Sequence, residues 1–158
     1  MTKKTLNFIG IAFVALFLQL TLSRWLSIQE IKPDFLVIAI IIIAQTEGVL
    51  AGEIFGFIIG LIADGIGLSV LFGLSAFSKT IVGFLGGFLE NKKSSLNPFY
   101  YYFIIITIIL IHYIILYTIY YNTGQMSLQI KMLRYVLPST IYTSIFYILL
   151  DNIIPIRR

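Results

Sequence analysis

Six apolar segments follow one another along this chain, and only short polar connections separate them. Two of the segments, Phe35 to Thr46 and Val49 to Ala63, are each shorter than the ~17 to 25 residues that cross a bilayer as a helix. Joined without a break, they would form a helix of ~45 Å against ~30 Å of hydrocarbon. A break is therefore expected at Thr46, Glu47 and Gly48. The six expected helices are about 6–22, 34–46, 49–63, 74–89, 99–121 and 133–154.

Composition favours lipid as the solvent of these helices. The chain is 59% hydrophobic and 11% charged, and its mean hydropathy is +0.98. So few polar residues cannot cover the surface of a water-soluble domain of 158 residues. The connections are also too short to form a domain outside the membrane. We therefore predict an all-α integral membrane protein with a single polytopic domain that covers residues 1–158.

The basic residues favour six crossings over five if the amino terminus is cytoplasmic. Positively charged loops stay preferentially on the cytoplasmic side. Six crossings place six basic residues inside and four outside, whereas merging the second and third segments reverses that balance. Both termini are then expected in the cytoplasm. The inside set is Lys3, Lys4, Lys92, Lys93, Arg157 and Arg158, and the outside set is Arg24, Lys32, Lys131 and Arg134.

Small residues recur at every fourth position of the third segment. At about 3.6 residues per turn they form one stripe along a helix, and in lipid such a stripe allows close approach of another helix. A second stripe of mostly small residues follows in the fourth segment. The two stripes comprise Gly48, Gly52, Gly56, Gly60 and Asp64, and then Ser75, Lys79, Gly83 and Gly87.

Asp64 and Lys79 are expected to form an intramembrane charge pair. A hairpin of the third and fourth helices would bring the two stripes together, and the flexible stem of Lys79 could reach Asp64. A structural ion pair that fixes the register of the hairpin is favoured over a proton or ligand role, and snorkelling of Lys79 without a partner is the third alternative.

Glu53 and His112 are candidates for a polar pocket. Glu53 lies about 100° from the glycine stripe, so it faces either an internal cavity or a partner protein. His112 has no acidic residue at three or four positions on its own helix. A buried histidine bonded to a carbonyl group is favoured over a proton relay.

Motifs for catalysis are missing. A single histidine and no cysteine exclude two-histidine and thiolate metal sites, and the glycine-rich stretches lack the Lys-Ser/Thr of a phosphate-binding loop. Glu53 and Asp64 lie ~16 Å apart along one helix, so they cannot share one reacting group. We predict no enzyme, no catalytic residues, no metal and no cofactor.

Pro33 and Asp34 open the second helix, the glycine stripe and Asp64 follow, and Gly73 comes after them. With this order of residues the chain resembles the rod-shape-determining membrane protein family MreD. The resemblance implies a non-catalytic subunit of the bacterial elongation machinery in the inner membrane, which acts with the bitopic protein MreC, the MreB filament and the glycosyltransferase and transpeptidase that build lateral peptidoglycan. It also implies a compact six-helix bundle similar to the substrate-binding subunits of energy-coupling-factor transporters. The residues that carry the resemblance are Pro33, Asp34, Gly48, Gly52, Gly56, Gly60, Asp64 and Gly73.

Two questions remain open from the sequence. The groove from Gly48 to Gly60 can receive either the fourth helix of the same chain or the transmembrane helix of MreC. The function can alternatively be that of a transporter subunit that captures a vitamin or metal between helices, with Glu53, His112 and the tyrosines of the fifth segment. A channel is disfavoured because the ionisable residues trace no continuous path.

Overall fold

The computed structural model describes residues 3–29, 31–68, 71–120 and 127–153. Within these ranges the chain is all-helical, as predicted. Tyr121, Ile154, Arg157 and Arg158, which entered the predictions above, lie outside the described residues. The helices are α1 (Lys3–Trp25), α2 (Phe35–Glu47), α3 (Val49–Gly65), α4 (Leu74–Gly87), α5 (Pro98–Tyr120), α6 (Leu128–Lys131) and α7 (Leu137–Ile153), with the π-helical turn η1 (Met132–Val136) between the last two.

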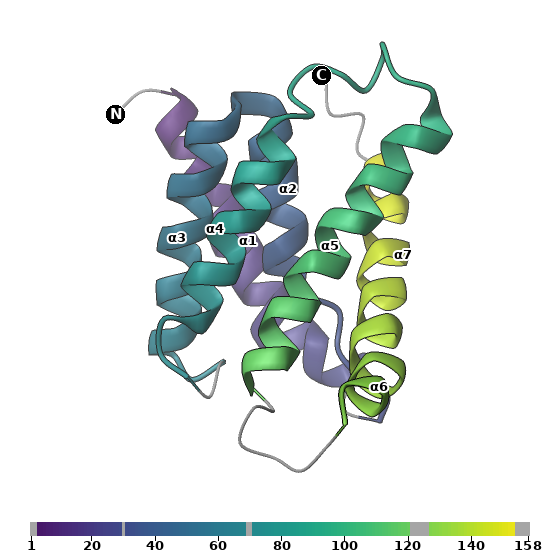
Figure 1. Cartoon of the computed structure of the whole chain (residues 1–158). Coiled ribbons are helices and arrows are strands. Elements are labelled where there is room, and N and C mark those ends of the chain that lie inside the picture. The colour runs from purple at the N-terminus through teal and green to yellow at the C-terminus, as the bar shows by residue number, and fades with distance from the viewer. Residues whose placement is uncertain (1–2, 30, 69–70, 121–126, 154–158) are drawn as a thin grey trace.

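Successive long elements run in opposite directions, so the bundle has two distinct ends (Figure 1). At the Glu47 end, α1 begins, α2 turns into α3, α4 connects to α5, and α7 finishes. At the Trp25 end, α1, α3 and α5 finish, and α2, α4 and α6 begin. The first residue of α1 and the last residue of α7 are therefore at the same end of the bundle.

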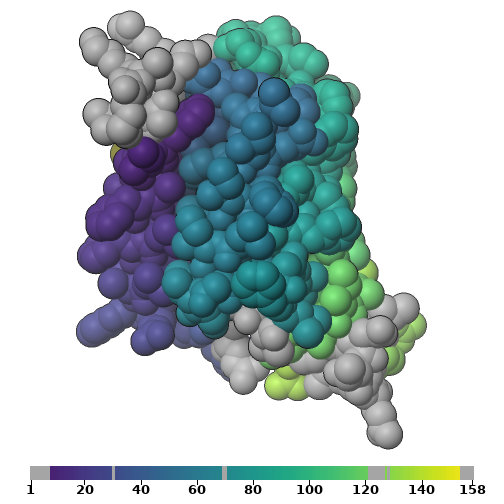
Figure 2. Space-filling view, turned by 90° about the vertical axis from the view of Figure 1, so that its left-hand side faces the viewer, coloured from purple at the N-terminus to yellow at the C-terminus, as the bar shows by residue number. Residues whose placement is uncertain are grey.

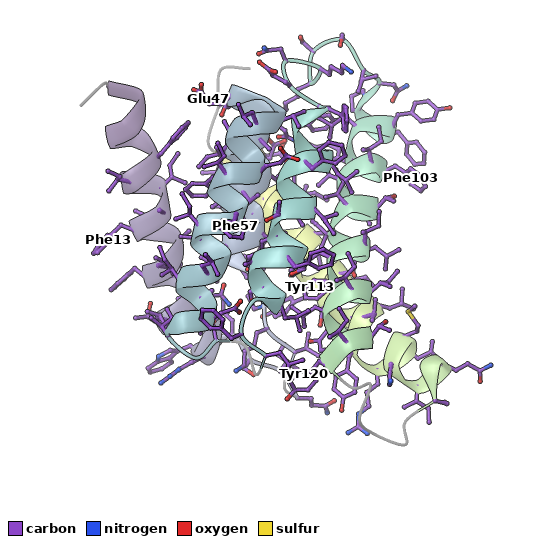
Figure 3. The ribbon with its side chains drawn as sticks, turned by 60° about the vertical axis from the view of Figure 1, so that its left-hand side comes forward. Phe13, Glu47, Phe57, Phe103, Tyr113 and Tyr120 are labelled. Atoms are coloured by element: carbon purple, nitrogen blue, oxygen red, sulfur yellow. The ribbon has the colours of Figure 1, made fainter. Side chains whose placement is uncertain are left out.

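Three helical stretches are long and apolar enough to cross a membrane by their length and composition. They are Phe8–Trp25, Pro98–Tyr120 and the continuous stretch Gln129–Ile153. The surface agrees with a lipid environment, because large apolar side chains point outward, among them Phe13 and Phe103 (Figure 3). Phe13 is 71% exposed. These features are consistent with a membrane protein.

The shortest apolar helix, α2, forms the centre of the bundle. Ten of its thirteen residues are buried, and it contacts α1, α3, α4 and α7. A helix that is apolar on all sides is stable only where other helices or lipid surround it, which matches this position. Figure 2 shows α1 beside α3 on the outside of this core, with much of its own surface uncovered.

The connection between α2 and α3 is a true hairpin, at the break expected from the sequence. Gly48 lies between the two helices with φ +86°, a conformation that L side chains rarely adopt. Its N–H donates to the carbonyl of Ala44, which closes the last turn of α2. The chain therefore reverses direction here and does not merely kink.

The last helix starts at Leu128, earlier than the expected residue 133, and contains a π-helical turn. The N–H of Leu137 bonds to the carbonyl of Met132, five residues before it. Pro138 follows directly and has no N–H to continue the regular ladder. A wider turn before a proline is a common way to keep such a helix continuous.

Candidate functional site

The glycine stripe of α3 packs against α4 of the same chain. A Cβ atom added at Gly52 would lie 2.6 Å from the carbonyl oxygen of Gly83, and one added at Gly60 would lie 2.5 Å from the Cα of Ala76. At Gly56 an added Cβ would meet the backbone of Lys79. Side chains are excluded because the two backbones touch. Of the two occupants proposed for the groove, α4 of the same chain packs there along Gly52, Gly56 and Gly60.

The α4 side of this interface uses the predicted small residues as well. An added Cβ at Gly83 would collide with the backbone of Gly52, and one at Gly87 would collide with the backbone of Val49. Ser75 is buried next to Gly60, whose added Cβ would lie 2.8 Å from the Ser75 carbonyl oxygen. Both stripes therefore form one internal contact that runs along the length of the hairpin.

Asp64 caps α4 and does not pair with Lys79. Its carboxylate accepts hydrogen bonds from the N–H groups of Gly73 at 2.8 Å, Ser75 at 3.3 Å and Ala76 at 3.4 Å. These backbone donors have no partner within α4, and a carboxylate also suits the positive end of the helix dipole. The predicted Asp64–Lys79 pair is wrong because this cap holds the carboxylate at the start of α4.

Lys79 pairs instead with Asp34. The ammonium nitrogen lies 3.0 Å from Asp34 Oδ2, and the two side chains are 3% and 14% exposed. The other carboxylate oxygen, Oδ1, accepts from the N–H groups of Leu36 and Val37 at 3.0 Å each, so Asp34 is also the N-cap of α2. One side chain thereby starts a helix and neutralises a buried cation.

His112 completes this cluster from α5. Its Nε2 lies 3.5 Å from Asp34 Oδ2, and its side chain is fully buried. Glu53 is only half-buried on α3 and contributes nothing to this group. The structure thus does not bring Glu53 and His112 into the shared pocket that the sequence suggested. His112 joins Asp34 and Lys79 in a buried cluster, which we call the Asp34 cluster.

The buried charge of Asp34 was not predicted from the sequence. Its signal was present, because an aspartate after Pro33 and immediately before an apolar segment is typical of a helix N-cap. A residue at the end of a helix is expected near the membrane surface, so Asp34 was not among the residues considered as charges inside the membrane. Its ion-pair partner lies 45 positions away, and no local pattern specifies such a distance.

A second polar network joins α2, α5 and α7 nearer the Glu47 end. The hydroxyl groups of Tyr101 and Tyr147 each donate to Gln45 Oε1 at 3.0 Å, and all three residues are almost completely buried. At the same end Lys93 pairs with Asp151 at 2.7 Å, and the Tyr102 hydroxyl donates to that carboxylate. Polar side chains at helix interfaces commonly fix the contacts of membrane helices.

A cavity of about 510 Å³ extends from the Asp34 cluster toward the Trp25 end. Asp34 and Lys79 line it together with Lys32 from the α1–α2 connection. Along α5 it follows one face from Tyr113 to Tyr120, a rise of ~10 Å. Figure 3 places Tyr113 in the middle of the bundle and Tyr120 at its end. Its size is that of pockets that hold small molecules.

Among the described residues, no group of three or more His, Asp or Glu side chains is positioned to hold a metal ion. The Asp34 cluster includes an ammonium group, which repels a cation.

Comparison of the chain with models of protein families, with curated proteins and with solved structures finds no match.

Proposed function

We propose that this chain is a non-catalytic subunit of the bacterial cell-elongation machinery, of the MreD type, which resides in the inner membrane and binds MreC. One observation carries the proposal: the residues behind the resemblance to MreD form one structural unit. Asp34 caps α2 and pairs with α4. The glycines join α3 to α4, and Asp64 caps α4 through the N–H of Gly73. These motif residues hold the helices together, as is expected of a structural, non-catalytic subunit.

The proposed topology has six crossings with both termini in the cytoplasm. The antiparallel order of the helices and the shared end of α1 and α7 support it (Figure 1). Lys92 and Lys93 lie in the α4–α5 connection at that same end, which the positive-inside rule assigns to the cytoplasm. The helices α2, α3 and α4 are short for a crossing, but α2 is enclosed by other helices and does not need to match the lipid thickness by itself.

Because α4 fills the glycine groove, the proposal assigns MreC to another surface. Helix α1 is the least covered of the three long apolar helices, with 11% of the stretch Phe8–Trp25 buried. Phe13 and Phe17 are 71% and 58% exposed on it. In lipid, two helices associate through close side-chain packing. Because α1 is long enough to cross the membrane and is largely uncovered, we assign the contact with the single transmembrane helix of MreC to α1.

The test is affinity purification of the tagged full-length protein from its native membrane, followed by mass spectrometry. We expect MreC and wall synthases to co-purify, and we expect Phe13→Ala with Phe17→Ala to reduce the recovery of MreC. The matched control is Phe103→Ala, which removes an exposed phenylalanine from α5. Normal rod shape in cells that lack the protein, together with no recovery of MreC, would refute the proposal.

A second candidate is the substrate-capturing subunit of a small-molecule transporter, and the cavity favours it. About 510 Å³ between helices, with tyrosine rings and charged groups on its wall, resembles a ligand pocket. This candidate predicts a metabolite in stoichiometric amount and ATP-driven coupling subunits in the same purification. If they co-purify and MreC does not, the transporter hypothesis replaces the scaffold hypothesis.

A further inference from the structure

The wall of the cavity carries more hydrogen-bond donors than its acceptors can use. Lys79 is an ammonium group with three N–H donors, and within the described part of the chain it bonds to one acceptor, Asp34 Oδ2. Lys32 stands exposed at the mouth and forms no ion pair with any described residue. Two cations and one carboxylate therefore give the wall a net positive charge.

The amide of Gln19 adds further donors. The N–H of Phe35 donates to Gln19 Oε1 at 2.8 Å, and this bond fixes which end of the amide is the oxygen. The NH₂ end is then the other end of a side chain that also lines the cavity. No bond from this NH₂ group to another described residue is present.

Three of the acceptor-bearing side chains on the wall are already engaged. Asp34 receives two backbone N–H groups on one oxygen and Lys79 on the other. The hydroxyl group of Tyr113 is 2.6 Å from that of Thr143, and the hydroxyl group of Tyr117 is 3.2 Å from that of Ser139. A ligand that brings acceptors, and preferably negative charge, would complement this wall.

Apart from Ser27 and Ser75, the remaining wall is apolar and aromatic. Leu68, Leu74 and Leu116 line it, and the rings of Tyr113 and Tyr117 stack with centroids 5.9 Å apart. Tyr135 packs against Tyr117 at 5.6 Å. Such a surface gains free energy by covering an apolar group, at roughly 25 cal/mol per Å².

We propose that this cavity binds an amphiphilic anion, with its carboxylate or phosphate between Lys32 and Lys79 and its apolar body against the leucines and tyrosines. The anion can belong to a membrane lipid or to a free fatty-acid-like molecule, since both present the same chemistry. This site goes beyond the scaffold role, and it does not depend on whether the chain binds MreC.

The test uses the purified full-length protein in phosphatidylcholine nanodiscs and measures binding by calorimetry and native mass spectrometry. The probes are laurate, its uncharged methyl ester, and inorganic phosphate. Saturable binding of laurate, with weaker binding of the ester and of phosphate, is the expected result. Equal binding of laurate and ester, or no saturable binding of laurate, would overturn the proposal.

Variants locate the site. Lys32→Gln removes an exposed charge at the mouth and should weaken laurate binding about threefold, whereas Lys32→Arg should retain it. The matched control is Lys92→Gln at the opposite end of the bundle, which should leave binding unchanged. If both glutamine variants weaken laurate binding equally, laurate is attracted by the overall positive charge of the protein, and the proposed site is wrong.

A last arm identifies the source of the anion. Nanodiscs that contain phosphatidylglycerol should abolish laurate binding if the site prefers a lipid headgroup, and should leave it intact if the site prefers a free amphiphile. Recovery of MreC in the purification described above is a separate readout, so failure of either proposal leaves the other testable.

Discussion

The ammonium nitrogen of Lys79 lies 3.0 Å from the carboxylate of Asp34, although 45 positions separate the two residues. Because both side chains are largely buried, each charge depends on the other. Removing one partner leaves an uncompensated charge inside the bundle, whereas removing both does not.

We therefore expect Lys79→Met to destabilise the protein by about 3 to 5 kcal/mol. The double variant Lys79→Met with Asp34→Asn should recover part of that loss, because asparagine is neutral and still caps α2. Thermal unfolding of the purified protein in detergent measures both. A double variant that is less stable than Lys79→Met would contradict this account of the pair.

Gly56→Ala should destabilise the α3–α4 contact by about 1 to 3 kcal/mol, because the added methyl group meets the backbone of Lys79 and the helices must separate. Gly10→Ala is the matched control, since an added Cβ at that helical glycine has nothing within 4 Å. The melting temperatures of the two variants are compared. Equal effects of both substitutions would refute the close packing of the glycine stripe.

Asp64→Ala should cost about 1 kcal/mol, because three N–H groups at the start of α4 lose their acceptor. Asp64→Asn keeps one side-chain oxygen and should cost less. Hydrogen exchange of the first turn of α4 reports the loss locally. Unchanged exchange in the alanine variant would exclude the cap.

Tyr147→Phe should destabilise the bundle by about 1 kcal/mol, because Gln45 Oε1 loses one of its two tyrosine donors in a buried site. Tyr100→Phe is the control on α5, where the side chain is 62% exposed. Denaturant titration in mild detergent compares the two variants. A larger effect at Tyr100 would contradict the importance of this network.

The sequence predicted what depends on local periodicity. The lengths of two apolar segments located the turn at Gly48, and the spacing of four glycines located a close helix contact. The partner of each buried charge could not be predicted from the sequence, because it depends on how whole helices pack. Asp64 and Lys79 share a hairpin, yet backbone donors at the start of α4 are closer to Asp64 than the ammonium group of Lys79.

The sequence suggested a pocket with the tyrosines of the fifth segment, and Tyr113, Tyr117 and Tyr120 do line the cavity, but the rest of its wall could not be predicted. Its wall combines Gln19 from α1, Lys32 from a connection and Tyr135 from a π-helical turn. Those residues share no spacing in the chain. The packing of α1 on α2, of α2 on α4, of α4 on α5 and of α5 on η1 brings them to one space. A periodic pattern indicates which face of a helix is apolar but not which residues lie opposite that face.

The hairpin at Gly48 also has a consequence for biogenesis. Helix α2 has thirteen residues, about 20 Å of length, and is too short to be held across a bilayer on its own. In the proposed six-crossing topology, α2 would enter the lipid together with α3, as a pair joined by the turn. During synthesis Asp34 then precedes its cation by 45 residues. Within α2 the carboxylate can be held by the N–H groups of Leu36 and Val37, but its buried cation is supplied only after α4 has been synthesised.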